Sequence, residues 1–122
     1  MKKNTLAFIL WAIFLFAACT KTSESKVLIR IQNNTSSNFK EVTTNQKIFS
    51  NVQSLEVTSY QTFDKVIDLP FVQLIDVNND TTFAGMIYID PPVSYLSNGK
   101  YTLDVFEDTL AYYGYNCRYI KD

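Results

Sequence analysis

Short stretches that alternate apolar and polar residues, separated by clusters of turn formers, dominate the sequence after residue 26. Val27, Ile29 and Ile31 recur at every second position, which is the period of a strand with one buried face. No segment in this region sustains the period of about 3.6 residues that an amphipathic helix requires. The pattern therefore predicts an all-β chain.

Local signals place the strands and their irregularities. Phe39 and Val42 are three residues apart and can share a face only across a β-bulge. Gly85 indicates a bulge or a close backbone approach, and Pro91-Pro92 is expected to end a strand. Asn98-Gly99 predicts a tight hairpin turn. We expect strands near residues 27–32, 39–44, 55–63, 71–77, 83–89, 101–105 and 113–120.

About seven short strands with turns between them predict a single antiparallel β-sandwich, with an open barrel as the alternative. The run at 71–77 is dense in apolar residues and is expected to be a central strand with both faces covered. Cys117 lies in an alternating stretch on the same face as Tyr115 and Tyr119, so we expect these three side chains to belong to the core.

Composition excludes several classes of function. The chain has 11 Lys and Arg against 12 Asp and Glu, which is neither the footprint of a nucleic-acid-binding protein nor a polybasic membrane patch. It has no histidine, so Ser–His–Asp and Cys–His catalysis and His-ligated zinc are excluded. Its three glycines lie too far apart to form a phosphate-binding loop. We expect no cofactor and no nucleic-acid partner.

The first 19 residues carry two lysines, an apolar run at residues 6–18, and then Cys19. Thirteen apolar residues are too few to span a bilayer, which takes ~20. The pattern resembles a bacterial lipoprotein signal, whose lipobox ends in two small residues and cysteine, here Ala17-Ala18-Cys19. The resemblance implies that Cys19 carries lipid and becomes the N-terminus. A secretory signal cleaved elsewhere, or an uncleaved anchor, are the alternatives.

The remaining chain is similar to small lipoproteins of the Bacteroidota that hold one β-sandwich behind a lipid anchor. The stretches that carry this similarity are VLIRIQNNTSSNFKEV, SLEVTSYQTFDKV, LPFVQL and PPVSYLSNGKYTL. The resemblance implies a signal peptide at 1–18, a lipidated cysteine and polar tether at 19–26, and a β-sandwich domain at 27–122. It places the protein in the cell envelope, anchored to the outer membrane rather than the inner one, and assigns no functional residue beyond Cys19.

Acidic residues provide two weak candidates for chemistry. A hydrolase would need two facing carboxylates, and the available ones are Asp104, Glu107 and Asp108 in one group and Asp64 and Asp68 in another. We interpret these as solvated loop charges.

Asp76, Asn78 and Asp80 alternate as the first ligands of a calcium loop do. Thr81 and Ile87 replace the glycine and the glutamate that such a loop requires, so we favour a hairpin turn.

Two further patterns concern the surface. Tyr112 and Tyr113 lie at the start of the last expected strand and are candidates for ligand contact. Asp80-Thr81-Thr82 and Asp108-Thr109-Leu110 resemble sites at which this group of bacteria O-glycosylates exported proteins, with Thr81 and Thr109 as acceptors. Use of these sites requires both loops to be exposed.

The leading hypothesis is a lipid-anchored envelope protein without catalytic activity, which binds or supports an envelope protein or a glycan. A carbohydrate-binding module with a tyrosine-lined surface is the alternative, and a carboxylate-based hydrolase is a third.

Overall fold

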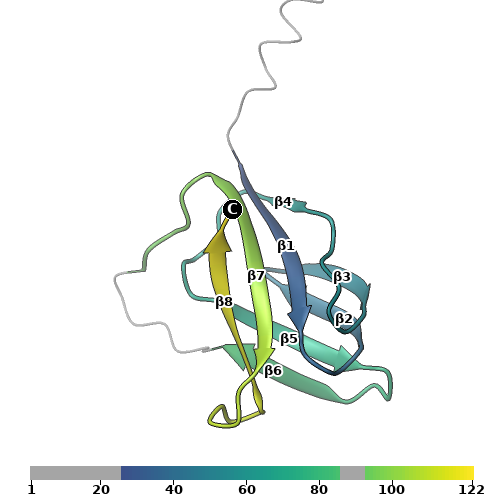
Figure 1. Cartoon of the computed structure of the whole chain (residues 1–122). Coiled ribbons are helices and arrows are strands. Elements are labelled where there is room, and N and C mark those ends of the chain that lie inside the picture. Colours follow the sequence, from purple (N-terminus) through teal and green to yellow (C-terminus); the bar gives the residue numbers. More distant parts are fainter. Residues whose placement is uncertain (1–25, 86–92) are drawn as a thin grey trace, which may run out of the picture.

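The computed structural model describes residues 26–85 and 93–122, which form a sandwich of two four-stranded sheets (Figure 1). The first sheet contains, in spatial order, β4 (Gln61–Phe63), β1 (Val27–Asn34), β7 (Gly99–Glu107) and β8 (Tyr115–Lys121). The second contains β3 (Lys47–Val52), β2 (Phe39–Thr44), β5 (Phe71–Asp76) and β6 (Thr81–Gly85). The predicted all-β sandwich is confirmed. Within the two described ranges, no helix is long and apolar enough to cross a bilayer.

The core lies between the sheets and is made by the inward-facing positions of both. Tyr115 and Tyr119 pack against it, and Cys117 between them is buried, as predicted. Burial of such side chains is the main force that holds a domain of this size together. The core residues are Val27, Ile29, Ile31, Phe39, Val42, Phe49, Val52, Phe63, Val66, Val72, Leu74, Ala84, Tyr101, Leu103, Val105 and Cys117.

The hairpin of β2 and β3 confirms the predicted bulge and adds a strand that the sequence analysis missed. The register of β2 against β5 shifts between Phe39 and Glu41, which lets Phe39 and Val42 both face the core. β3 went unpredicted because Ile48 on it is half exposed and Asn51 has a left-handed φ of 53°, so its apolar residues do not alternate.

The first sheet is built around a parallel pair, β1 and β7, which run in register from Val27 opposite Gly99 to Asn34 opposite Phe106. β8 pairs antiparallel with the other edge of β7. Both edges of β7 are thus occupied, and the hairpin predicted at Asn98-Gly99 is wrong. Gly99 instead begins β7, and its N–H donates to the carbonyl of Lys26 at 3.2 Å.

The strand predicted at 55–63 is wrong over most of its length, since only β4 at its end is regular. The preceding residues follow the end of β1 without forming a ladder. The Thr58 hydroxyl accepts the Ile31 N–H at 2.9 Å, in the place of a backbone carbonyl, and Leu55 has a φ of 66°. A side-chain acceptor and a left-handed residue therefore interrupt the strand.

The central position of β5 and the close backbone approach at Gly85 are confirmed, but the burial expected on both faces of β5 is not. β5 lies inside its sheet, between β2 and β6, but only its inner face is buried, and Phe71 and Gln73 on the outer face are half-buried. Gly85 makes the predicted close approach, because a Cβ atom there would lie 2.1 Å from the Pro70 carbonyl oxygen. The expected end of the strand at Pro91-Pro92 lies outside the described residues.

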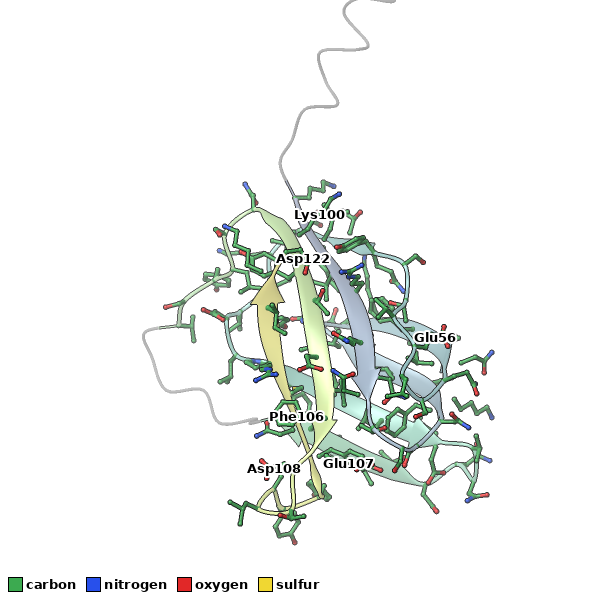
Figure 2. All side chains as sticks on the ribbon, viewed as in Figure 1. Glu56, Lys100, Phe106, Glu107, Asp108 and Asp122 are labelled. Atoms are coloured by element: carbon green, nitrogen blue, oxygen red, sulfur yellow. The ribbon has the colours of Figure 1, made fainter. Side chains whose placement is uncertain are left out.

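The long strands give the molecule two ends. The proximal end, where β1 and β7 begin, holds Lys26, Phe63 and Gly99. The distal end, where both strands finish, holds Asn34 and Phe106. The first and last of the eight residues of β1 are separated by seven steps of ~3.3 Å, which sets the two ends roughly 23 Å apart. Figure 2 shows Lys100 and Asp122 at the proximal end, and Phe106, Glu107 and Asp108 at the distal end.

Candidate functional site

The loop between β7 and β8, residues 108–114, forms the distal tip of the molecule (Figure 1). The Asp108 carboxylate accepts hydrogen bonds from the Leu110 N–H at 3.0 Å and from the Asn116 side-chain amide at 3.2 Å. The Asp108 N–H donates to the Gly114 carbonyl at 2.9 Å, which closes the loop. These bonds hold the loop in one shape, so its side chains project in a defined direction.

The distal loop presents apolar side chains to solvent. Leu110 is 95% exposed, Tyr112 is 92% exposed and Tyr113 is 48% exposed. Side chains of this kind usually lie inside a protein, and several together on a fixed loop mark an interaction surface. Both tyrosines that the sequence nominated for ligand contact therefore lie at the surface, within one loop.

A row of aromatic rings connects this loop to the second sheet. Tyr112 lies edge-on to Tyr113 with ring centroids 4.8 Å apart, and Tyr113 lies 5.5 Å from Phe83 on β6. Phe83 stacks on Phe71 of β5 at 5.7 Å. Ala84, beside Phe83, is buried in the core, so the two phenylalanines face outward from their sheet. The aromatic row thus runs over the β6 edge and onto the outer face.

A hollow of about 300 Å³ opens beneath the loop. That volume is at the lower end of the range of small-molecule sites, ~300–1,000 Å³. Gly85 forms part of its wall with a φ of 92°, a conformation that side chains rarely adopt. The hollow is lined by Phe83, Gly85, Ala111, Tyr112, Tyr113, Tyr115 and Asn116.

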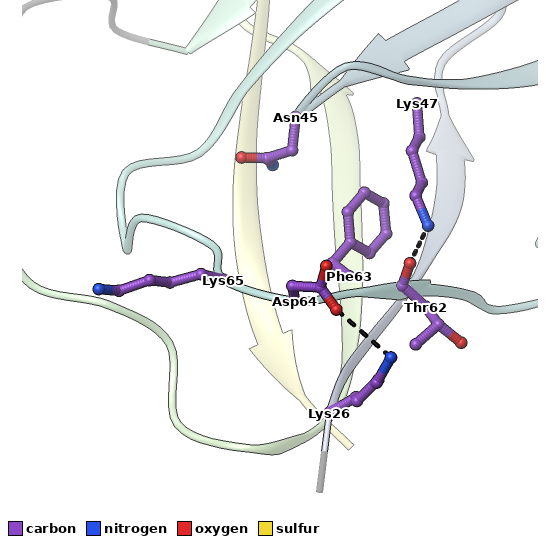
Figure 3. A pocket seen from close by; sticks show the side chains of 7 residues that line it. All are labelled: Lys26, Asn45, Lys47, Thr62, Phe63, Asp64 and Lys65. Carbon is purple, nitrogen blue, oxygen red and sulfur yellow. Dashed lines mark hydrogen bonds and ion pairs between the residues drawn. The ribbon is translucent and has the colours of Figure 1, made fainter. Parts of the chain in front are cut away.

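A second hollow, of about 460 Å³, lies at the proximal end and is polar (Figure 3). Lys26 lies 3.4 Å from the Asp64 carboxylate, and Lys47 donates to the Thr62 carbonyl. The Lys47 ammonium also lies 4.9 Å from the centroid of the Phe63 ring. The lining is completed by Asn45 and Lys65. The two hollows thus differ in chemistry, one aromatic and one cationic.

The carboxylates proposed for acid–base chemistry do not converge. Asp104 is buried on β7 and accepts hydrogen bonds from the Asn34 amide at 2.6 Å and from Arg118 at 3.0 Å. Glu107 accepts from the hydroxyl and the N–H of Ser36, and these bonds lower the pKa of its carboxyl group. Each carboxylate thus has its own structural partners.

The remaining members of the two acidic groups have equally separate positions. Asp108 shapes the distal loop, whereas Asp64 pairs with Lys26 at the proximal end. Asp68 is exposed, and its N–H donates to the Ser94 carbonyl at 2.8 Å. Neither group forms a facing pair of carboxylates across a cleft.

The segment from Asp76 to Asp80 is the turn of the β5–β6 hairpin, as we favoured. The Asp76 carboxylate accepts the N–H groups of Asn78 at 2.8 Å and Asp80 at 3.0 Å. This oxygen therefore stabilises the turn itself. Across residues 26–85 and 93–122, no three acidic or cysteine side chains gather as metal ligands would.

The two threonines of the glycosylation motifs are both exposed, Thr81 at the start of β6 and Thr109 in the distal loop. Glycosylation requires exposed acceptors, and both threonines meet this requirement. Their modification stays a prediction.

Cys19 lies outside the described residues. Burial raises the pKa of the Cys117 thiol to about 12, with a smaller effect from Asp104, so this thiol is not a nucleophile at neutral pH.

The tyrosines of the distal site were predicted from the sequence, but the residues that complete the site were not. Phe83, Gly85 and Ala111 line the hollow, and Phe71 extends the aromatic row. The register of the β5–β6 hairpin sets Gln73 opposite Phe83 and so brings the two phenylalanines together on one face. Only a correct prediction of the register of this hairpin from the sequence could have revealed that these residues meet.

Comparison with known proteins adds no assignment to this geometry: no protein-family model matches the chain, and no curated protein matches it.

Proposed function

We propose that this protein is a lipid-anchored module of the cell envelope that binds a partner through its distal loop and has no catalytic activity. The anchor is the lipidated Cys19 implied by the signal-like N-terminus. The partner is an envelope protein, and the contact is made by Leu110, Tyr112 and Tyr113. We place the protein on the outer membrane rather than the inner one.

The observation that carries this proposal is the exposure of apolar side chains on a loop that is held rigid by hydrogen bonds. Leu110 and Tyr112 are more than nine-tenths exposed, while Asp108 fixes the backbone beneath them. A preformed loop loses little conformational entropy on binding, so the buried apolar area contributes to affinity. Tyrosine is also among the residues enriched at binding hot spots.

Several structural roles of the acidic groups support a binding function over a hydrolytic one. Asp104 accepts hydrogen bonds from Asn34 and Arg118. Glu107 accepts them from Ser36, and Asp108 accepts one from the backbone of its own loop. A general acid or base needs a carboxyl group within reach of a substrate. These side chains instead hold the fold together.

Photo-crosslinking in the native cell tests the binding surface. A photoreactive residue at position 112 is expected to capture one discrete protein, whereas the same residue at Lys40 on β2 is not. Lys40 is a matched control because it is also exposed and lies on the second sheet. Capture of the same species from both positions, or of none from position 112, would contradict the proposal.

Intact-mass analysis of the protein from native membranes tests the anchor. The expected species begins at Cys19 and carries acyl chains, since more than one chain gives lasting attachment. A species that retains Met1, or that begins elsewhere without added hydrocarbon, would contradict it.

Carbohydrate binding is the second candidate, and the aromatic hollow favours it. Three tyrosine rings and the Asn116 amide surround a space of about 300 Å³, which combines stacking faces with a hydrogen-bonding group. Signal on a glycan array that is lost on Tyr113→Ala would support this alternative. An array without signal above background would exclude it.

A further inference from the structure

Five of the six lysines in the described residues lie at the proximal end of the sandwich. Lys26 directly precedes β1, Lys100 pairs with Leu28, and Lys121 pairs with Tyr101. The other two border the proximal hollow (Figure 3), and the full set is Lys26, Lys47, Lys65, Lys100 and Lys121. We call this set the lysine face. The sixth lysine, Lys40, contacts Asn79 of the β5–β6 turn.

Most of the lysine face interacts with neutral groups. The Lys65 ammonium lies 4.0 Å from the centroid of the Tyr95 ring, and that of Lys100 lies 5.5 Å from the Tyr60 ring. Lys121 approaches the Ser97 hydroxyl at 3.4 Å. Lys26 forms an ion pair with Asp64. Lys100 lies near Asp122, whose pKa is lowered mainly by the hydrogen bond from Tyr60, with smaller effects from Thr102, Arg30 and Lys100. These contacts position the ammonium groups without neutralising the face as a whole.

Acidic side chains show the opposite distribution. At the proximal end they are Asp64 and Asp122, and Asp68 lies nearby, beside the segment that contacts Lys65. Asp122 is held by Arg30, Tyr60 and Thr102. Towards the distal end they are more numerous: Glu56 bonds to Asn33 through its carbonyl, Asp76 and Asp80 form the β5–β6 turn, and Glu107 and Asp108 end β7. The sandwich therefore has a positive proximal end and a negative distal end.

The lysine face lies at the end where the N-terminal segment joins the sandwich. From Cys19 to Lys26 the chain advances by seven residues, which at ~3.6 Å each reaches at most about 25 Å. A lipid on Cys19 therefore keeps the proximal end close to the membrane surface.

We propose that the lysine face lies against the anionic headgroup surface of the membrane that holds the anchor, and that this contact directs the distal loop away from the bilayer. This inference rests on the proposed lipid anchor and adds an orientation to it. Lysines close to an anionic surface each gain attraction, which fades beyond the Debye length of ~8 Å at physiological salt. The distal acidic groups would be repelled by the same surface.

Lysine footprinting on vesicles tests the proposal with the intact lipidated protein. The protein is added to phosphatidylcholine vesicles, with or without about one third phosphatidylglycerol, and labelled briefly with an impermeant amine-reactive ester. We expect the five lysines to label at least about threefold more slowly on the anionic vesicles, while Lys40 labels equally on both. Salt at about 1 M should remove the protection, because the Debye length falls to ~3 Å.

Charge reversal gives a second, independent readout. Lys47→Glu with Lys65→Glu should abolish the protection of Lys26, Lys100 and Lys121, whereas Lys40→Glu should leave it unchanged. All three substituted side chains are exposed, so the fold should tolerate these changes.

Flotation of the same mixtures separates this inference from the anchor. Flotation with both vesicle types and equal labelling would overturn the lysine face and leave the anchor intact. Flotation with anionic vesicles alone would support the lysine face and overturn the anchor. Failure to float with either would overturn both, and protection of Lys40 on anionic vesicles would overturn the orientation.

Discussion

The two ends of the sandwich present opposite chemistries. The proximal end carries Lys26, Lys65 and their neighbours around a polar hollow, whereas the distal end carries Leu110 and Tyr112 beside an aromatic hollow. Both ends are set by the same parallel pair of strands, β1 and β7. A chain of nearly balanced net charge is therefore strongly polar in space. It also suggests a division of roles, with membrane contact at one end and partner binding at the other.

Removal of the proposed lipid site should have the largest effect, because it would detach the proximal end from the membrane. Cys19→Ala is expected to lower the membrane-bound fraction at least about tenfold, because the lysine face alone cannot replace acyl chains that each bury many methylene groups. Fractionation of native cells with immunodetection measures it. Cys117→Ala is the matched control and should remain in the membrane fraction. Unchanged partitioning of the Cys19 variant would argue against the anchor.

The wall of the distal hollow should be the most sensitive part of the fold. Gly85→Ala is expected to cost about 3 kcal/mol or more, because it combines a left-handed φ with a Cβ atom 2.1 Å from the Pro70 carbonyl oxygen. Gly114→Ala shares the left-handed φ but has no heavy atom within 4 Å, so it should cost only ~1–2 kcal/mol. Urea unfolding followed by circular dichroism compares them. Equal costs would mean that the close approach at Gly85 contributes nothing.

The distal loop should affect binding without affecting stability. Leu110→Ser with Tyr112→Ser is expected to weaken partner binding about thirtyfold or more, since the loss of a hot-spot side chain costs ~2 kcal/mol or more. The free energy of unfolding should change by no more than ~0.5 kcal/mol, because both side chains are exposed. Val77→Ser, on another exposed turn, is the control and should leave binding unchanged. Wild-type capture by the double variant would refute the role of the loop.

The buried thiol between the sheets should give an effect that is absent at neutral pH and appears only in alkaline solution. Burial raises the pKa of Cys117 to about 12, whereas an unfolded thiol ionises near ~8.5. Between these values the native state keeps a proton that the unfolded state has lost, so stability falls as pH rises. The free energy of unfolding is unaffected by this thiol below pH ~8.5. Between that pH and the native pKa it declines by about 1.4 kcal/mol per pH unit.

Cys117→Ala removes this dependence, so the stability difference between wild type and variant should change across pH ~9–11. Parallel unfolding curves for the two proteins over that range would show that Cys117 does not titrate as its burial requires.

Local physical signals in the sequence were sufficient for most of the fold. The alternation in β1, the bulge at Phe39, the close approach at Gly85 and the burial of Cys117 were predicted because each depends on neighbouring residues. The parallel pairing of β1 with β7 joins residues about 70 positions apart and has no local signature. Asn98-Gly99 was read as a hairpin turn for the same reason, since the partner of β7 is distant.

The candidate site was predicted in part. Tyr112 stood out because it precedes the last strand, but Phe83 joins it only through the fold. The lysine face was hidden for a comparable reason, because Lys26, Lys65 and Lys121 are scattered through the sequence and net charge averages over them. A surface formed by residues from several strands cannot be predicted from amino-acid composition.

Fluorescence quenching at two positions tests whether the proximal end faces the membrane and the distal loop points away from it. With the proposed lipid on Cys19 and with Cys117 buried, a cysteine introduced at position 65 or 110 is the reactive thiol, and each variant is labelled with one fluorophore. On anionic vesicles that contain spin-labelled headgroups, we predict strong quenching at position 65 and little at position 110, since the two ends lie roughly 23 Å apart. Quenching at position 110 equal to or stronger than that at position 65 would contradict the account.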